Sequence, residues 1–331
     1  MSATPLRLVE FTRSFYLGGT EGQVVELVRG LKPRYDLRIA VLQEVGPLAP
    51  DIRAMGFAPE SFPLNGSAAR PNTAVQAVRL ARWLKKTGAQ LLHVHDFYAT
   101  LIAVPAARMA GCRVVVGRLD LAHWHGRARR AALSALTHAA SHVVANADAV
   151  REMLVQEERL PPSRVTVIRN GIDLPRFDAQ RAAGLASPLP EVNGEPVAVL
   201  VANMNHPVKR QEDFLEAVAR VRARRPLQAF LVGDGPRRPA LEQKASELGV
   251  AHAVHFLKHR QDIPAVYAQA AVGVLCSDAE GLSNAIIEGM ASRLPMVVTD
   301  AGGNAELVQD GERGWVVPKR DPSALAEALL R

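Results

Sequence analysis

The sequence contains little cysteine and no long apolar run, and each shortage excludes a class of protein. Its 331 residues include only Cys112 and Cys276. We therefore expect neither a disulfide framework nor a cysteine-based metal site, and a reducing compartment suits the chain. No apolar run reaches the roughly 18 residues of a membrane-spanning helix, and the amino terminus lacks the apolar core of a signal peptide. We predict a cytoplasmic location.

Aromatic residues are also scarce, at 5% of the chain, and they follow no stacking pattern, which argues against a nucleic acid partner. Acidic residues fall short of basic ones, which leaves a net charge of +7. Basic residues gather at 79–86 and 127–130, in patterns that predict amphipathic helices. The preferred interpretation is a solvated helix face. The alternative is contact with an anionic membrane, at the inner face of the plasma membrane.

Short apolar runs alternate with helical patterns along the whole chain. Strands are predicted at 6–11, 37–42, 91–95, 114–116, 142–145 and 165–168, and again at 197–201, 229–232, 255–257, 272–276, 296–298 and 315–317. This order predicts βαβ units and mostly parallel sheets. Residues 179–193 are rich in small residues and proline and predict a linker. The expected fold is α/β, with two facing Rossmann-like domains at 1–178 and 194–331.

The helical pattern that starts near residue 321 is still running at Arg331, and no capping signal follows it. From this pattern we expect the natural chain to be longer.

The most informative segment is 280–288, which follows the apolar run at 272–276. Glu280 lies in the loop after this predicted strand, and Glu288 lies about 8 Å along the helix that Ser283 or Asn284 can cap. The amides of Leu282, Ser283 and Asn284 would form an anion site at the helix start. Two carboxylates around a phosphate site suit a sugar nucleotide.

Other loops carry weaker signals. The Gly18-Gly19 pair precedes a helix whose start Thr20 and Gln23 could close as a capping box, and it is not the glycine pattern of a nicotinamide dinucleotide site. His93 and His95 share one face of a strand. We interpret His93 as a core residue and His95, at the strand's carboxyl edge, as a site residue. A zinc site would need further ligands, and spacing indicates none.

Lys209 follows a predicted strand and could neutralise a leaving diphosphate, although spacing alone favours an ordinary surface lysine. Gly233 and the Gly302-Gly303 pair, taken alone, indicate turns after strands.

Taken in order, these segments resemble the retaining glycosyltransferases of family 4, which have the two-domain GT-B fold. The resemblance is specific from Val197 to the chain end and looser in the first half, where Gly18-Gly19, His93-Val-His95 and Asn170-Gly-Ile-Asp173 follow the expected order. In the second half it depends on Lys209, Gly233-Asp-Gly-Pro236, Glu280 to Glu288, Pro295, Gly302-Gly303 with Glu306, and Asp310-Gly311 before Gly314.

The resemblance implies roles for single residues. Three are expected at the reaction centre: His95 beside the reacting sugar, Lys209 at the leaving phosphate and Glu280 on the sugar hydroxyls. The remaining ones are expected to bind the donor: Glu288 at the ribose, the amides after Gly281 (Leu282, Ser283, Asn284) at the diphosphate, Lys258 to Arg260 beside the base, Gly18 and Gly19 where a ligand comes close, and Gly233 in its turn.

Two departures from the family pattern stand out. Asn203 occupies a position where many members have arginine, and Arg210 could supply the missing charge from a neighbouring position. The family's closing helix, which crosses back to the first domain, would lie beyond Arg331. The sequence also has no Asp-x-Asp metal motif, so protein cations are expected in place of a metal, with no cofactor besides the nucleotide-sugar co-substrate.

The expected activity is the transfer of a sugar, with retained anomeric configuration, to a glycan or lipid-linked acceptor in cell-surface polysaccharide synthesis. Two alternatives stay open. One is another sugar-nucleotide enzyme such as an epimerase, against which the paired glutamates speak. The other is a catalytically lapsed binding partner, which Asn203 would suit.

Overall fold

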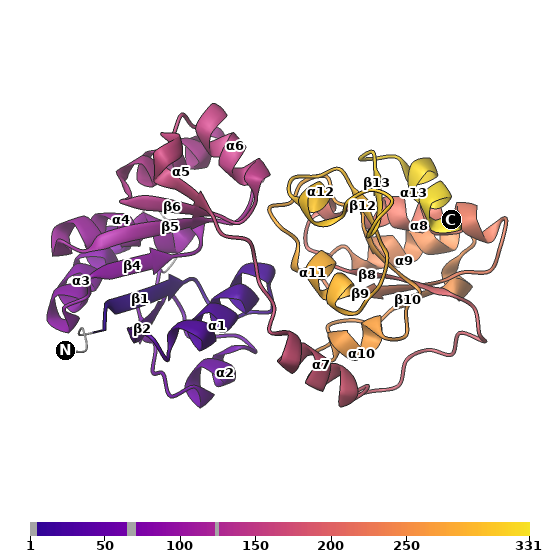
Figure 1. Ribbon diagram of the computed structural model, residues 1–331, viewed down its shortest axis with the longest axis horizontal. Coiled ribbons are helices and arrows are strands. Elements are labelled where there is room, and N and C mark those ends of the chain that lie inside the picture. The colour runs from indigo at the N-terminus through magenta and orange to yellow at the C-terminus, as the bar shows by residue number, and fades with distance from the viewer. Residues whose placement is uncertain (1–4, 65–70, 123–125) are drawn as a thin grey trace. The chain divides into compact units, whose positions relative to one another are not determined.

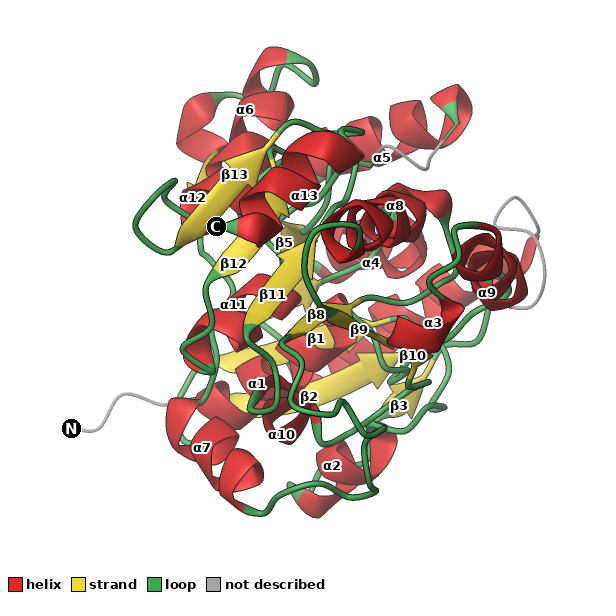
Figure 2. Ribbon diagram, turned by 90° about the vertical axis from the view of Figure 1, so that its right-hand side faces the viewer, coloured by secondary structure: helices red, strands yellow, loops and turns green. Residues whose placement is uncertain are grey.

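A computed structural model describes residues 5–64, 71–122 and 126–331. The chain divides into two compact units, Met1–Gly171 and Ile172–Arg331 (Figure 1). Each unit is an α/β structure with a parallel sheet between helices, as Figure 2 shows by secondary structure.

Seven parallel strands make up the first unit's sheet in the described residues, in the order β3-β2-β1-β4-β5-β6-β7. These are β1 (Arg7–Thr12), β2 (Asp36–Val41), β3 (Glu60–Ser61), β4 (Leu91–Val94), β5 (Arg113–Arg118), β6 (His142–Ala145) and β7 (Val165–Val167). The helices are α1 (Gly19–Leu31), α2 (Ala49–Ala54), α3 (Pro71–Thr87), α4 (Phe97–Ala110), α5 (Arg127–Ala139) and α6 (Asp148–Gln156).

Both faces of this sheet are covered, which is why its strands are apolar along most of their length. Val9 and Phe11 of β1 point to the face that α3 and α4 cover, where Leu80 and Ile102 pack against them. Leu8 points to the other face, toward Val28 of α1. Apolar cores therefore fill both faces of the sheet. Polar side chains lie instead in the loops that follow the carboxyl ends of the strands.

The second unit contains six parallel strands among the described residues, in the order β10-β9-β8-β11-β12-β13. They are β8 (Val197–Val201), β9 (Gln228–Val232), β10 (Val254–Phe256), β11 (Val272–Leu275), β12 (Met296–Thr299) and β13 (Gly314–Val317). The helices are α7 (Leu174–Ala182), α8 (Gln211–Arg222), α9 (Arg238–Glu247), α10 (Ile263–Tyr267), α11 (Asn284–Ala291), α12 (Asn304–Leu307) and α13 (Pro322–Leu330).

Each sheet changes its winding direction once. In the first unit the change falls between β1 and β4, and in the second between β8 and β11. Loops diverge at such a switch point, so the crevice beyond the strands' carboxyl ends is the expected ligand site of an open parallel sheet. The order of strands therefore selects two places to search for function.

The predicted fold class, α/β with two Rossmann-like domains and parallel sheets, is confirmed. Every predicted strand is present to within two residues, and the two-residue edge strand β3 was not predicted.

The unit boundary differs from the prediction. The chain passes into the second unit at 171–172, so residues 179–193 do not form the connection. Helix α7 packs beside α10, the amide of Ala186 donates to Asp262 Oδ2 at 2.7 Å, and Leu189 joins the second unit's core. These contacts place the segment in the second unit. Its small residues and prolines do not prevent it from packing.

The predicted capping box at Thr20 and Gln23 was wrong. Helix α1 begins after Gly18 with no side-chain cap. The Gln23 amide instead binds the backbone of Gly171, with Nε2 donating to the carbonyl at 2.9 Å and the Gly171 amide donating to Oε1 at 3.2 Å. In the described ranges, no helix combines the length and apolar character needed to cross a membrane.

Candidate active site

An ion pair lies at the switch point of the second unit. Lys209 ends the turn that follows β8, and Glu280 lies in the loop after β11. Lys209 Nζ is 2.6 Å from Glu280 Oε1, and the hydroxyl of Ser277 donates to the same oxygen at 2.5 Å. The two charged side chains are 20% and 11% exposed. The structure thus brings together two of the predicted site residues, which lie 71 positions apart in the sequence.

The backbone around this pair is tightly fixed. Gly302 has φ +55°, and a Cβ placed there would lie 1.9 Å from the carbonyl oxygen of Glu280. The amide of Gly303 donates to the carbonyl of Gly281 at 2.8 Å. The Gly302-Gly303 loop therefore packs directly against the backbone of the Glu280 loop. Glycine at position 302 allows this close approach because it has no Cβ.

Helix α11 starts directly after this loop. Gly281, Leu282 and Ser283 are buried, Ser283 is the cap position, and Asn284 is the first helical residue. Ser283 makes no side-chain cap bond. Its predicted role as the helix start is thus met by position alone, and the backbone amides of the first turn remain the anion-binding feature.

Glu288 lies one turn further along α11 and is half-buried. Burial raises its pKa from 4.5 to about 7. Burial, and then the charge of Glu288, raise the pKa of Tyr267, whose hydroxyl donates to the carbonyl of Ala285 at 2.9 Å. A glutamate with these surroundings can exchange between donor and acceptor states near neutral pH.

Three predicted donor-binding residues shape loops near the strand ends. Gly233 follows β9 with φ +135°, and its amide donates to the carbonyl of Lys258 at 2.8 Å. Lys258 itself has φ +57°. Asn203 follows β8, and its carbonyl accepts from Gln211 Nε2 at 2.8 Å. These residues fix the turns after β8, β9 and β10 beside one another.

Two predicted cations are committed elsewhere. Arg210 binds both carboxylate oxygens of Asp213 at 2.6 and 3.0 Å, so its charge neutralises this carboxylate in the first turn of α8. Arg260 is 8% exposed, binds both oxygens of Asp262 and donates to the carbonyl of Ser187 at 2.8 Å. These two hydrogen bonds use part of the five donors of the Arg210 guanidinium, and the expectation that Arg210 supplies the missing charge stays a prediction.

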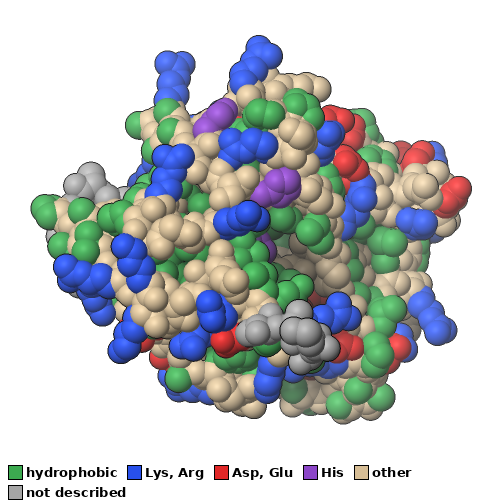
Figure 3. All heavy atoms as spheres, turned by 60° about the vertical axis from the view of Figure 1, so that its left-hand side comes forward, with side chains coloured by type: hydrophobic (Ala, Val, Ile, Leu, Met, Phe, Trp, Pro, Cys, Tyr) green, Lys and Arg blue, Asp and Glu red, His purple; other side chains and the backbone are tan. Residues whose placement is uncertain are grey.

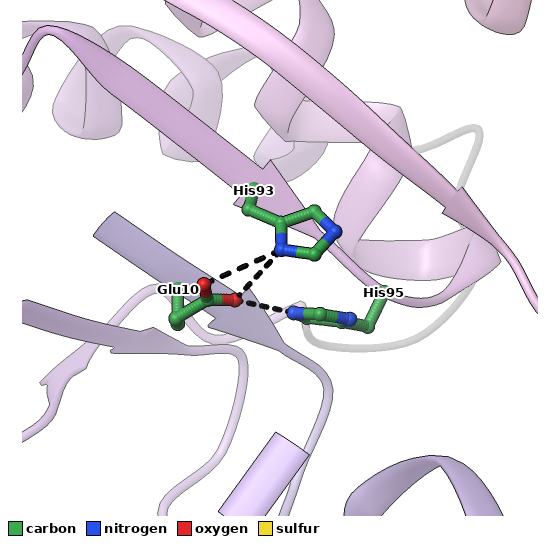
Figure 4. A group of neighbouring side chains, drawn as sticks. All are labelled: Glu10, His93 and His95. Carbon is green, nitrogen blue, oxygen red and sulfur yellow. Dashed lines mark hydrogen bonds and ion pairs between the residues drawn. The ribbon is translucent and has the colours of Figure 1, made fainter. Parts of the chain in front are cut away.

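The switch point of the first unit holds a second cluster. His93 and His95 converge on Glu10 of β1, as Figure 4 shows. His95 Nε2 lies 2.5 Å from Glu10 Oε2, and His93 Nδ1 lies 3.2 Å from the same oxygen. His93, predicted to be a core residue, is 17% exposed at the side chain, and its Nε2 has no hydrogen-bond partner among the described residues.

Burial and ion pairing act in opposite directions on this cluster. Burial alone would raise the pKa of Glu10, but the charges of and hydrogen bonds from His93 and His95 lower it to about 2. Burial, followed by the neighbouring His93, lowers the pKa of His95. Two imidazole nitrogens and a carboxylate oxygen within 4.8 Å of one another also form a set that can ligate a metal ion.

The Gly18-Gly19 loop is occupied by a neighbouring side chain. A Cβ at Gly18 would lie 2.3 Å from Glu21 Oε2, so glycine leaves room for this carboxylate to fold back over the helix start. Burial raises the pKa of Glu21. An acidic side chain therefore lies beside the α1 start, and the role of these glycines in letting the acceptor or the diphosphate come close stays a prediction.

Asp96 lies beside this loop as the cap of α4, where Oδ1 accepts from the Ala99 amide at 2.9 Å. Burial and the charge of Glu21 raise the pKa of Asp96 to about 6, against the hydrogen bond from Ala99 and the charge of Arg13. Its Oδ2 is buried and without a partner in the described part of the chain.

Sequence reasoning missed Ser277, Glu10, Glu21 and Asp96. For Glu10 a signal was present, because a lone carboxylate in a run of buried strand residues needs a partner. Ser277 carried no comparable signal, since serine is common in loops.

Two family models match the chain. The model described as Glycosyltransferase Family 4 matches residues 17–176, and the one described as Glycosyl transferases group 1 matches residues 195–331. The D-inositol 3-phosphate glycosyltransferase of Geodermatophilus obscurus is 32% identical over 210 residues, which are 57% of this chain and 45% of that protein. The match to the protein of the same name from Nocardia farcinica is 30% identical and covers 57% of this chain and 44% of that protein.

Solved structures agree on the fold. HepE of Anabaena, in complex with UDP-glucose, superposes with a TM-score of 0.83 at 21% identity over 98% of this chain and 89% of that chain. Sucrose-phosphate synthase from Thermosynechococcus elongatus gives a TM-score of 0.80 at 18% identity over 98% of this chain and 89% of that one.

The fold is therefore that of the GT-B class. The chain belongs to the group 1, family 4 glycosyltransferases. The matched segments span less than half of the curated relatives' length.

Proposed function

We propose that this protein transfers a sugar from a nucleotide-diphosphate sugar to a carbohydrate acceptor. The observation that carries the proposal is the Lys209–Glu280 contact of 2.6 Å at the switch point of the second unit. A cation, a carboxylate and a helix start meet there, and together they match a leaving phosphate, the hydroxyls of a sugar and a diphosphate. HepE, whose structure contains UDP-glucose, supports a donor of this class.

The ion pair also defines how the donor would be received. Lys209 already has a partner in Glu280, so an incoming diphosphate must compete with this carboxylate for the ammonium group. Once the phosphate takes over Lys209, Glu280 Oε1 keeps its hydrogen bond from Ser277 and can accept from a sugar hydroxyl. Binding of the donor would thus convert one internal ion pair into two donor contacts.

In the proposed reaction the glycosidic bond to the diphosphate breaks while the acceptor hydroxyl attacks the anomeric carbon from the same face. The hydroxyl proton passes to the departing phosphate oxygen, and the anomeric configuration is retained. Lys209 and the α11 amides stabilise the charge that develops on the phosphate without any protein nucleophile. We propose that Lys209, together with these amide dipoles, acts in place of a metal ion.

A binding screen tests the donor class. UDP-, GDP-, ADP- and TDP-sugars are added to the intact chain and thermal unfolding is followed. A donor present at 100 times its Kd stabilises the folded state by about 2.7 kcal/mol, a shift that is easily measured. Absence of a shift with every donor would favour the lapsed-partner alternative.

Glu280→Ala tests the site in a transfer assay with the donor that binds. We expect loss of transfer with an unchanged fold, and Glu280→Gln should retain weak donor binding because it keeps a hydrogen-bond acceptor. Glu327→Gln is the matched control, because it removes the same charge from an exposed ion pair with Arg224. Transfer by Glu280→Ala at the wild-type rate would refute the site.

The acceptor class is proposed from surface charge. Helix α3 exposes Arg79, Arg82, Lys85 and Lys86 together with Val75, which is 53% exposed. The space-filling view that brings the first unit forward shows many Lys and Arg side chains among apolar ones (Figure 3). Each basic residue near an anionic lipid surface contributes about 1 kcal/mol. We propose a glycan or lipid-linked acceptor of cell-surface polysaccharide synthesis, met at the inner membrane face.

Cosedimentation with vesicles tests this surface. The chain should bind phosphatidylglycerol vesicles and not phosphatidylcholine vesicles, and Lys85→Gln with Lys86→Gln should weaken binding. The control pair Arg220→Gln and Arg224→Gln removes the same charge from exposed positions of the second unit. If both double variants lost vesicle binding equally, the effect would depend on net charge and not on the surface of α3.

A further inference from the structure

The first unit carries a buried carboxylate that the proposed donor chemistry does not use. Glu10 lies in the middle of β1 between the core residues Val9 and Phe11, and its side chain is 0% exposed. An ionised carboxylate in such a place costs several kcal/mol unless it is paired and hydrogen-bonded. Glu10 must therefore have partners that offset the cost of burying its charge.

Those partners come from the neighbouring strand. The parallel register of β1 and β4 places Glu10 opposite His93, and His95 follows two residues later, on the same face of the strand. Both rings turn toward the carboxylate, with their centroids 4.1 Å apart (Figure 4). One acceptor group therefore holds two imidazoles from one strand.

The contact determines which nitrogen of His95 carries the proton. The nitrogen of His95 that faces Glu10 is Nε2, at 2.5 Å, and a carboxylate there accepts the proton that Nε2 donates. In a neutral ring Nδ1 is then unprotonated. Gly117 of β5 lies beside Nδ1, where a Cβ would be in ordinary contact with this nitrogen at 3.6 Å and close to the Val94 carbonyl oxygen at 3.3 Å.

We propose that Glu10 is a positioning residue for His95, which it holds in the Nε2–H tautomer and in one orientation at the switch point of the first unit. That His95 acts on the substrate rests on the proposed function, whereas the tautomer and the orientation do not. The lowered pKa of His95, caused first by burial, agrees with a neutral ring.

A metal ion is the competing explanation for the same three side chains. Ligand atoms each about 2.0–2.1 Å from a tetrahedral zinc ion lie more than about 3 Å apart. The 2.5 Å separation of Glu10 Oε2 and His95 Nε2 is shorter than this and fits a charge-assisted hydrogen bond. The geometry thus favours a shared proton.

Nitrogen NMR of the intact, histidine-labelled protein tests the inference without any substrate. We expect His95, identified by the signals lost in His95→Gln, to be neutral at pH 7 with its proton on Nε2. Glu10→Gln should shift these signals toward a mixture of tautomers. A proton on Nδ1 in the wild type, unchanged signals in Glu10→Gln, or zinc bound in stoichiometric amount would each overturn the proposal.

Transfer kinetics with the donor that binds distinguish a positioning role of Glu10 from a merely structural one. Glu10→Gln should lower kcat about tenfold or more, because small misplacements of a contacting group are costly, while the donor Kd stays within about threefold. The matched control is Glu158→Gln, which breaks the Arg118–Glu158 pair of 2.7 Å in the same unit. It should lower Tm and leave His95 signals and kcat unchanged.

Equal losses of kcat in Glu10→Gln and Glu158→Gln would reduce the role of Glu10 to stability. If instead no sugar nucleotide binds the wild type, the proposed function fails, while the NMR result on the tautomer still decides the role of Glu10.

Discussion

Replacing Glu288 by Gln should stabilise the protein at pH 8 and have little effect at pH 4.5. Burial raises the pKa of Glu288 from 4.5 to about 7. The folded state therefore binds this proton more tightly than the unfolded state, and stability falls as pH rises from 4.5 through 7. A difference of about 2.5 pKa units corresponds to about 3 kcal/mol, which the ionised form costs at pH 8. The neutral amide of Gln avoids this cost.

The assay is urea unfolding of wild type and Glu288→Gln at pH 4.5, 6 and 8, with Glu327→Gln as an exposed control. The stability difference between Glu288→Gln and wild type should grow with pH, whereas an exposed ion pair contributes less than about 1 kcal/mol at any of them. A difference independent of pH would refute the reasoning. Nucleotide binding should weaken in the same variant if Glu288 holds the ribose, as the family resemblance implies, so stability and function would change in opposite directions.

Further substitutions test other parts of both sites. Gly302→Ala should destabilise the fold by more than about 2 kcal/mol in urea unfolding, because φ is +55° and the new Cβ would meet the Glu280 carbonyl at 1.9 Å. Lys209→Met should weaken donor binding about tenfold to a hundredfold by calorimetry, since a charge-assisted contact is lost. The wild type should lose about 2–3 kcal/mol of stability as pH rises from 3.8 to 6, because the pKa of Asp96 is raised to about 6 in the folded state. Asp96→Asn should not show this loss, since asparagine does not ionise and still caps the helix. Unchanged values in any of these measurements would contradict the corresponding contact.

The strands could be predicted because parallel sheets buried on both faces require continuous apolar runs, and these are visible in the sequence. The chain segment 179–193 could not be placed, because whether small residues form a linker or pack depends on a partner such as Asp262, which lies far away in the sequence. The same limit applies to the helix start at Gly18, where Gln23 binds the backbone of Gly171, which is distant in the sequence.

The sequence could predict that Lys209 and Glu280 lie near each other, but not that they form a direct ion pair. Both residues follow strands that lie next to each other at the switch point, and this much follows from the order of strands. The contact itself depends on side-chain conformations that local sequence does not specify. Arg260, which the family resemblance places beside the base, pairs with Asp262 two residues away, and its role at the base stays a prediction.

Each cluster joins residues that are distant along the chain but contained within one unit: Glu10 and His95 are 85 positions apart, and Lys209 and Glu280 are 71 apart. Parallel pairing of this kind closes long loops and is intrinsically slow. The first unit can nonetheless fold, its histidine cluster included, before the second unit is complete, because domains generally fold as units in order from the amino terminus. The second cluster has to wait for β11, so the two halves of the molecule mature at different times during synthesis.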